Sequence, residues 1–324
     1  IDVGEVAIYN EVTEVKGAVH MPISIFGFQA LWSPYLLVGL LFITIFYFLI
    51  TVKWQGKFKE SEPLKKNEAI YFVLGIISFY IIKGSPIDLL GHIMFTMHMV
   101  QMAFLLLLVP ILFIKGIPWW VWKVVVEAPI IRTIFQVFTK PLVSIVVFIG
   151  LFSVYHLPSV FDTIKLNELY HLAYTSILFI SAIFMYWPLL NNVEGQHEMK
   201  NMNKLAYIAS NAVLITPACA LIIFATSPMY GTYADSDMWL KAMELCVPST
   251  TLSGLTLSGP ELFSNMDLIS DQQVGGVLMK IIQEIIFGVI LFKIFRRWWN
   301  TERKNPEEIT ENALKEFQNR TRYQ

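Results

Sequence analysis

Histidines and methionines inside an apolar stretch are the residues of this chain whose types and spacing could do chemistry. His92 and His98 lie within the apolar run 89–114, which also contains Met94, Met97, Met99 and Met102. Imidazole nitrogen and thioether sulfur together suit copper, with the thioether favouring Cu(I), and they also suit haem iron. Because an ionisable side chain is costly inside lipid, the run predicts a functional site.

The composition indicates a membrane protein. Of 324 residues, 55% are hydrophobic and 15% are charged, and the mean hydropathy is +0.56; soluble proteins carry about 25% charged residues. The two cysteines, Cys219 and Cys246, form no CxxC or CxxxC motif. A disulfide framework, a zinc ribbon and a CxxxC thiol copper site are therefore unsupported. No nucleophile triad or acid–base dyad is visible, so we expect no enzyme.

Seven apolar segments predict an all-α, polytopic fold with seven transmembrane helices. The predicted spans are residues 34–52, 69–82, 89–114, 141–157, 169–190, 205–226 and 274–295. The second is short for a span, and the charge distribution is what requires it to cross. We expect three parts: an extracytoplasmic or interfacial segment 1–30, a membrane domain 31–295, and a charged, helical cytoplasmic tail 296–324.

The distribution of basic residues predicts the orientation. Nineteen of the 24 Lys and Arg residues lie in loops 53–66, 115–140 and 191–204 or in the tail with Lys293. Basic residues gather on the cytoplasmic side of bacterial membranes. The amino terminus is therefore predicted outside and the carboxyl terminus in the cytoplasm.

This topology places four histidines at a similar depth. His92 lies near the outer surface and His98 about 9 Å deeper at 1.5 Å per residue, while His156 ends the fourth span and His171 begins the fifth. Neighbouring antiparallel helices usually pack together, so the four predict a metal or cofactor site. A core role would be the simpler interpretation for any one of them alone.

Helical spacing suggests how the site divides. His92 and His98 lie about 120° apart around a regular helix, so one shared ion requires a distorted helix, or there are two sites. We expect an outer cluster of His92, His156 and His171, with His98 deeper. Met94 and Met102 share the His98 face, although methionine is also a common gap-filler.

Several polar residues could support these ligands. Asp88 precedes His92 by one helical turn and could orient its ring. Asp271 is expected to cap the seventh span, with a supporting role at the site left open. Glu284 could belong to an ion path or could simply pair with Lys280 four residues earlier.

The sequence resembles the CtaG-like assembly factors of caa3-type cytochrome c oxidase over residues 28–295. The resemblance lies in the run from His92 to Gln101 (HIMFTMHMVQ), in His156-Leu-Pro followed by Asp162, in His171, in the Ser-Pro-Met-Tyr motif 227–230, and in the segment DQQVGG at 271–276. Many members carry His where this chain has Met102, which leaves a softer His/Met site open. The resemblance implies a multi-pass bacterial plasma-membrane protein required for oxidase maturation, supplying copper, with Gln101 and Asp162 among the supporting residues.

The leading interpretation is a non-enzymatic factor that binds copper at the outer membrane face and helps load it into a terminal oxidase. The expected partners are the oxidase subunits and membrane lipid; a homo-oligomer is left open, and nothing indicates nucleic acid. A copper transporter would need ligands continuing inward from His98. A b-type haem protein would use two of the outer histidines on one haem.

Overall fold

The structure is a computed structural model that describes residues 21–193, 199–253, 255 and 257–304, with side chains described up to residue 300. His20, His197 and the tail beyond residue 304 lie outside these ranges, as does most of the predicted amino-terminal segment. Within the described residues every regular element is a helix, which agrees with the predicted all-α class.

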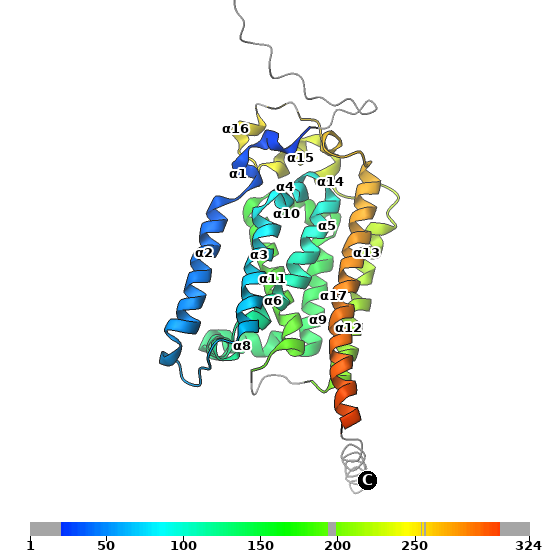
Figure 1. Ribbon diagram of the computed structural model, residues 1–324. Helices are drawn as coiled ribbons and strands as arrows, with labels where there is room; N and C mark the ends of the chain where they lie inside the picture. Colours follow the sequence, from blue (N-terminus) through cyan, green and yellow to red (C-terminus); the bar gives the residue numbers. More distant parts are fainter. Residues whose placement is uncertain (1–20, 194–198, 254, 256, 305–324) are drawn as a thin grey trace, which may run out of the picture.

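Long apolar helices run side by side along one direction (Figure 1). Their bounds are α2 (Pro34–Phe48) extended by a π-helical turn η2 (Leu49–Lys53), α3 (Lys66–Gly84), α5 (Phe95–Ala103) followed by a π-helical segment η4 (Phe104–Leu108) and α6 (Val109–Gly116), α9 (Pro141–Tyr155), α11 (Glu168–Leu190), α12 (Asn201–Leu214) with α13 (Thr216–Ile223), and α17 (Leu268–Lys304).

Short helices cover the two ends of this bundle. One end carries η1 (Ile23–Phe26), α1 (Phe28–Leu31), α4 (Pro86–Ile93), α10 (Pro158–Lys165), α14 (Gly231–Ala234), α15 (Ser236–Met243), α16 (Ser249–Leu252) and η5 (Pro260–Leu262); the other carries η3 (Gln55–Lys57), α7 (Trp119–Glu127) and α8 (Pro129–Phe138).

Six helices are long and apolar enough to cross a membrane, and a seventh is reached if α8 and α9, bent by 86°, are counted as one span. The six match six of the seven predicted spans, including the short second one, which the structure extends to 19 residues. The described chain starts at the end with α15 and finishes at the opposite end, where α17 ends (Figure 1). These features indicate a multi-pass membrane protein.

The core lies around α5 and α6, the most buried of the long helices. Two glycines allow neighbours to approach: Gly275 of α17 lies against Phe95 and Thr96, and Gly116 lies against the backbone of Phe72 on α3. By contrast, α2 stands at the edge of the bundle with most of its large apolar side chains exposed. An apolar exposed face of this kind is suited to lipid.

Two of the long helices are irregular close to a proline. The π-helical segment η4 ends at Leu108, two residues before Pro110, which has no N–H to donate to the preceding turn. The sixth span is divided at Ile215, two residues before Pro217, into α12 and α13. The helix that contains the predicted seventh span is longer than the span: α17 begins six residues before position 274 and continues through residue 295 to Lys304.

Candidate metal centre

The predicted third span is interrupted beside its histidines. Met94 has extended backbone angles (φ −129°, ψ 138°), so α4 ends at Ile93 and α5 begins at Phe95. The prediction of one regular helix over 89–114 is therefore wrong at this position. His92 and His98 belong to different helices, and Met94 is the N-cap of α5 instead of a helical neighbour on the His98 face.

The carboxylate of Asp271 stabilises this interruption by capping the start of α5. Its Oδ2 accepts a hydrogen bond from the backbone N–H of Phe95 at 2.7 Å, and its Oδ1 accepts one from Thr96 at 3.1 Å. These are two of the N–H groups that a helix leaves unpaired at its start. Asp271 was expected to cap its own helix; it caps α5, and Asp267 caps α17 through the N–H groups of Ile269 and Ser270.

His92 and His171 form the first histidine pair. Their ring centroids are 5.6 Å apart and the rings are tilted by 71°. His92 lies on α4, His171 lies in the first turn of α11, and the side chain of His92 is almost fully buried. Its Nδ1 lies 3.3 Å from the Nζ of Lys165, a buried residue at the end of α10.

His98 and His156 form the second pair, with ring centroids 6.3 Å apart. His156 directly follows α9, and its Nδ1 lies 2.8 Å from the carbonyl of Phe152. Because a carbonyl only accepts, Nδ1 carries the proton and Nε2 offers a lone pair. Both ring nitrogens of His98 and Nε2 of His156 are buried and have no hydrogen-bond partner among the described residues. Such groups are rare, because leaving one unpaired costs about 1–3 kcal/mol.

The histidines are grouped differently from the sequence expectation. His156 was placed with His92 and His171, whereas its ring contact with another histidine is to His98. Aromatic side chains enclose this second pair: Phe161 lies 5.1 Å from the His98 ring and Tyr155 lies 5.9 Å from it, between centroids. All four histidines still lie at the end of the bundle that carries α4 and α10, as the topology predicted.

Asp88 and Gln101 form a polar network beside the first pair. Oδ1 of Asp88 accepts hydrogen bonds from Lys83 Nζ and from Gln101 Nε2, each at 2.5 Å. Gln101 also donates to the carbonyl of Ile82 at 3.0 Å. The network joins α3, α4 and α5, and it fixes the carboxylate one helical turn from His92.

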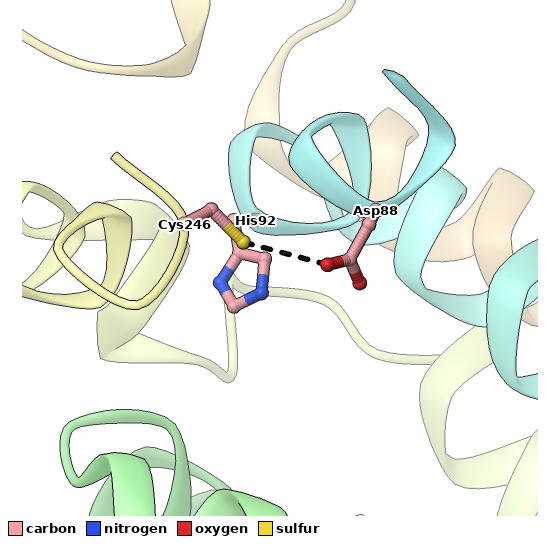
Figure 2. A group of neighbouring side chains, drawn as sticks. All are labelled: Asp88, His92 and Cys246. Carbon is pink, nitrogen blue, oxygen red and sulfur yellow. Dashed lines mark hydrogen bonds between the residues drawn. The ribbon is translucent and has the colours of Figure 1, made fainter. Parts of the chain in front are cut away.

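Cys246 is the ligand-type residue that sequence reasoning missed. Its Sγ lies 3.6 Å from Oδ2 of Asp88, and a ligand atom of each of Asp88, His92 and Cys246 lies within 4.8 Å of the others. Figure 2 shows the three side chains converging from α4 and from the segment after α15. Cys246 belongs to no paired-cysteine motif, and its one signal in the sequence is its position in a loop on the predicted outer side.

Lys165 was also missed, although it is one of only five basic residues outside the loops and tail predicted to be cytoplasmic. Burial lowers the pKa of Lys165 to about 7. Burial, and next the neighbouring Asp88, raise the pKa of the Cys246 thiol. The Cys246 thiol is therefore neutral at physiological pH, and Lys165 is protonated in only part of the molecules, which lowers the charge in this apolar surrounding.

Asp162 and two tyrosines support the histidines indirectly. Asp162 accepts hydrogen bonds from the backbone N–H groups of Gly231 and Thr232, both at 3.0 Å. This contact fixes α14, next to which Tyr230 donates to the carbonyl of His156 at 2.9 Å. Within α14, Tyr233 donates to the carbonyl of Gly91 at 2.7 Å.

The last predicted residues are Glu284, Met94 and Met102, and the carbonyl of Met94 accepts the backbone N–H of His98 at 3.2 Å. Glu284 pairs with Lys280 at 2.7 Å, and its side chain is 54% exposed. This geometry agrees with the simple ion-pair interpretation. Met102 is buried in α5 and Met94 is half-buried at the helix break.

Comparison with known families gives one match. The family described as cytochrome c oxidase caa3 assembly factor (Caa3_CtaG) matches residues 45–301, which contain all four of these histidines. The resemblance found in the sequence motifs is thereby confirmed. No curated protein and no solved structure matches the chain.

Proposed function

Because the chain belongs to the family of cytochrome c oxidase caa3 assembly factors, we propose that it binds copper at the outer face of the membrane and helps deliver it to a terminal oxidase. Copper is the cargo in this role, and the protein performs no catalysis on it. The expected partners are oxidase subunits during their maturation, and the expected location is the bacterial plasma membrane with the amino terminus outside.

The observation that carries the proposal is the lack of hydrogen-bond partners for ring nitrogens of the second histidine pair. His98 and His156 present three buried ring nitrogens with no partner among the described residues. A metal–nitrogen bond is about 2.0–2.1 Å long, so two imidazoles sharing one ion have centroids roughly 6 Å apart. The observed 6.3 Å fits such an arrangement.

The charge distribution supports an outer location. Basic residues such as Lys57 and Lys123 belong to the end of the bundle that carries η3 and α7. The histidines belong to the opposite end. Because basic residues favour the cytoplasmic side, the histidine end is assigned to the exterior.

The two other candidate functions receive less support. A haem held by His98 and His156 would need space for a macrocycle, and Phe95, Phe161 and Tyr155 pack directly against the His98 ring. A transporter needs polar ligands that continue inward. Glu284, the candidate for that path, is already paired with Lys280 and is half exposed.

Copper analysis of the purified, full-length protein tests the proposal. We expect bound copper with nitrogen ligands in X-ray absorption spectra, and we expect the nitrogen contribution to fall in both His98→Gln and His156→Gln. Asn211→Leu, which alters a buried polar residue of α12, is the control and should bind copper normally. A folded wild-type protein that binds no copper, or a histidine-independent signal, would refute the proposal.

A cellular measurement tests delivery separately from binding. A deletion strain should lose activity of the oxidase, and excess copper in the medium should restore part of it. Expression of His98→Gln should fail to complement at low copper, while Asn211→Leu complements. If copper never restores activity and the histidine variant complements fully, the protein assists assembly by another route.

A further inference from the structure

We propose that Asp88, His92 and Cys246 form a second, thiolate-containing site that takes up one Cu(I) ion at the outer end of the bundle, ahead of the histidine pair His98 and His156. This inference rests on the proposed function for the identity of the cargo. It adds a site, a ligand set and an order of binding that the histidines alone do not provide.

Three side chains of different ligand type converge there. The carboxylate of Asp88, the imidazole of His92 and the thiol of Cys246 offer atoms that all lie within 4.8 Å of one another (Figure 2). A single ion bound to two ligands at about 2.0–2.3 Å brings the ligand atoms roughly 3.5–4.5 Å apart. The apo arrangement is thus near the spacing that a bound ion requires.

Neighbouring residues outside the cluster hold its members in position, as in preorganised metal sites. Lys83 and Gln101 hold Oδ1 of Asp88, which leaves Oδ2 facing Cys246. Tyr233 and Lys165 both contact the carbonyl of Gly91, the residue before His92. The site therefore needs little rearrangement to bind.

Charge balance selects a monovalent ion. Asp88 is neutralised by its ion pair with Lys83, and Cys246 is a thiol before binding. When Cu(I) binds, the S–H bond of Cys246 breaks, a Cu–S bond forms, and the proton is released to solvent. One positive charge replaces another, and no electron is transferred. A divalent ion would add a net charge to a largely buried cluster, which is costly.

Ligand softness points to the same ion. Thiolate and thioether ligands select Cu(I), whereas carboxylate alone favours harder cations. Cys246 supplies the soft ligand and is only partly buried, so it can receive an ion from the outer side. Cys219, the other cysteine, is buried within α13 and has no such neighbours among the residues described.

His92 joins this cluster to His171, its partner in the first histidine pair. It is a member of the cluster, and its ring also contacts the His171 ring. An ion can therefore exchange ligands stepwise, keeping His92 while it leaves the sulfur. The sulfur site would load first and the imidazole pair second.

Cu(I) titration of the purified, full-length protein under anaerobic conditions tests this proposal. Two single variants are compared, Cys246→Ser and the matched control Cys219→Ser. We expect sulfur scattering from a thiolate in the X-ray absorption spectrum of wild type and Cys219→Ser, and its loss in Cys246→Ser together with the loss of one Cu(I) per chain. His98→Gln should keep the sulfur signal, because the outer site is intact.

A second measurement does not depend on the folding of the Cys246 variant. In the Cys219→Ser background, Cys246 is the only thiol, and Cu(I) should protect it from alkylation by N-ethylmaleimide. Copper bound through nitrogen with Cys246 still fully reactive would overturn the outer site while leaving the proposed function standing. Absence of any copper in wild type would overturn both.

Discussion

Asp271, in the first turn of α17, caps the N-terminus of α5 by accepting the backbone N–H of Phe95 at 2.7 Å. The two residues are 176 positions apart in the chain. The contact fixes where α4 ends and α5 begins, and thereby sets the directions in which His92 and His98 leave the backbone. A long-range cap of this kind is a testable part of the architecture.

Replacing Asp271 with Ala should destabilise the protein by about 2–3 kcal/mol, because two buried N–H groups lose a charged acceptor. Thermal unfolding of the purified protein, followed by tryptophan fluorescence, measures the change. Asp267→Ala is the matched control: it removes an exposed cap of α17 and should cost about 1 kcal/mol. Equal losses of stability in the two variants would show that the cap between α17 and α5 stabilises the protein no more than the exposed cap of α17 does.

Substitution of glycine by alanine should have opposite effects on stability at Gly116 and at Gly150. A Cβ on Gly116 would clash with the backbone nitrogen of Phe72 and would lie 2.7 Å from its Cα. Because backbone cannot move aside as a side chain can, Gly116→Ala should cost about 3 kcal/mol or more. Gly150, inside α9, has open space around it, so Gly150→Ala should be neutral or stabilise by about 0.5–1 kcal/mol. The melting temperatures of the two variants, compared with that of wild type, test both expectations.

Lys165 predicts a pH dependence of stability. Its pKa is about 7 in the folded state against an ordinary value of 10.5, so the unfolded chain binds more protons between these values. Stability therefore rises with pH above about 7, by at most about 1.4 kcal/mol per unit. The melting temperature of wild type should increase from pH 7 to 8.5, and the increase should shrink in Lys165→Met. An unchanged slope would mean that another group is responsible.

Glu284 should be dispensable for copper. Glu284 forms a partly exposed ion pair with Lys280, which lies one helical turn earlier. Such pairs contribute about 0.2–0.5 kcal/mol to the stability of a helix. Glu284→Gln should leave copper stoichiometry and oxidase maturation unchanged. Loss of copper uptake in this variant would instead favour a transport path along α17.

Hydropathy predicts the long helices of this protein well, because the length of an apolar run is a property of the local sequence. Six of the predicted spans each overlap one long apolar helix of the structure. The tendency of His92, His98, His156 and His171 to lie at one end also follows from span direction alone.

The details of the site depend on contacts that local sequence does not contain. Nothing near Met94 signals a break, since no proline or glycine adjoins it; the cap arrives from Asp271. Rotation of α9 and α11 about their axes decides which histidines meet, and hydropathy carries little information on that angle. Cys246 reaches Asp88 across 158 positions, so only the folded chain reveals the pair.

Backbone carbonyl groups at the end of α4 that have no partner within the helix constrain the length of the segment formed by α14 and α15. Gly91 and Ile93 offer oxygens to Tyr233 and to the indole nitrogen of Trp239, respectively. Shortening or lengthening the chain between these aromatic residues would remove one of two donors from the Gly91 oxygen and the indole donor from the Ile93 oxygen. The segment thus replaces hydrogen bonds that an uninterrupted third span would have made within itself, and this role limits how far its length can change.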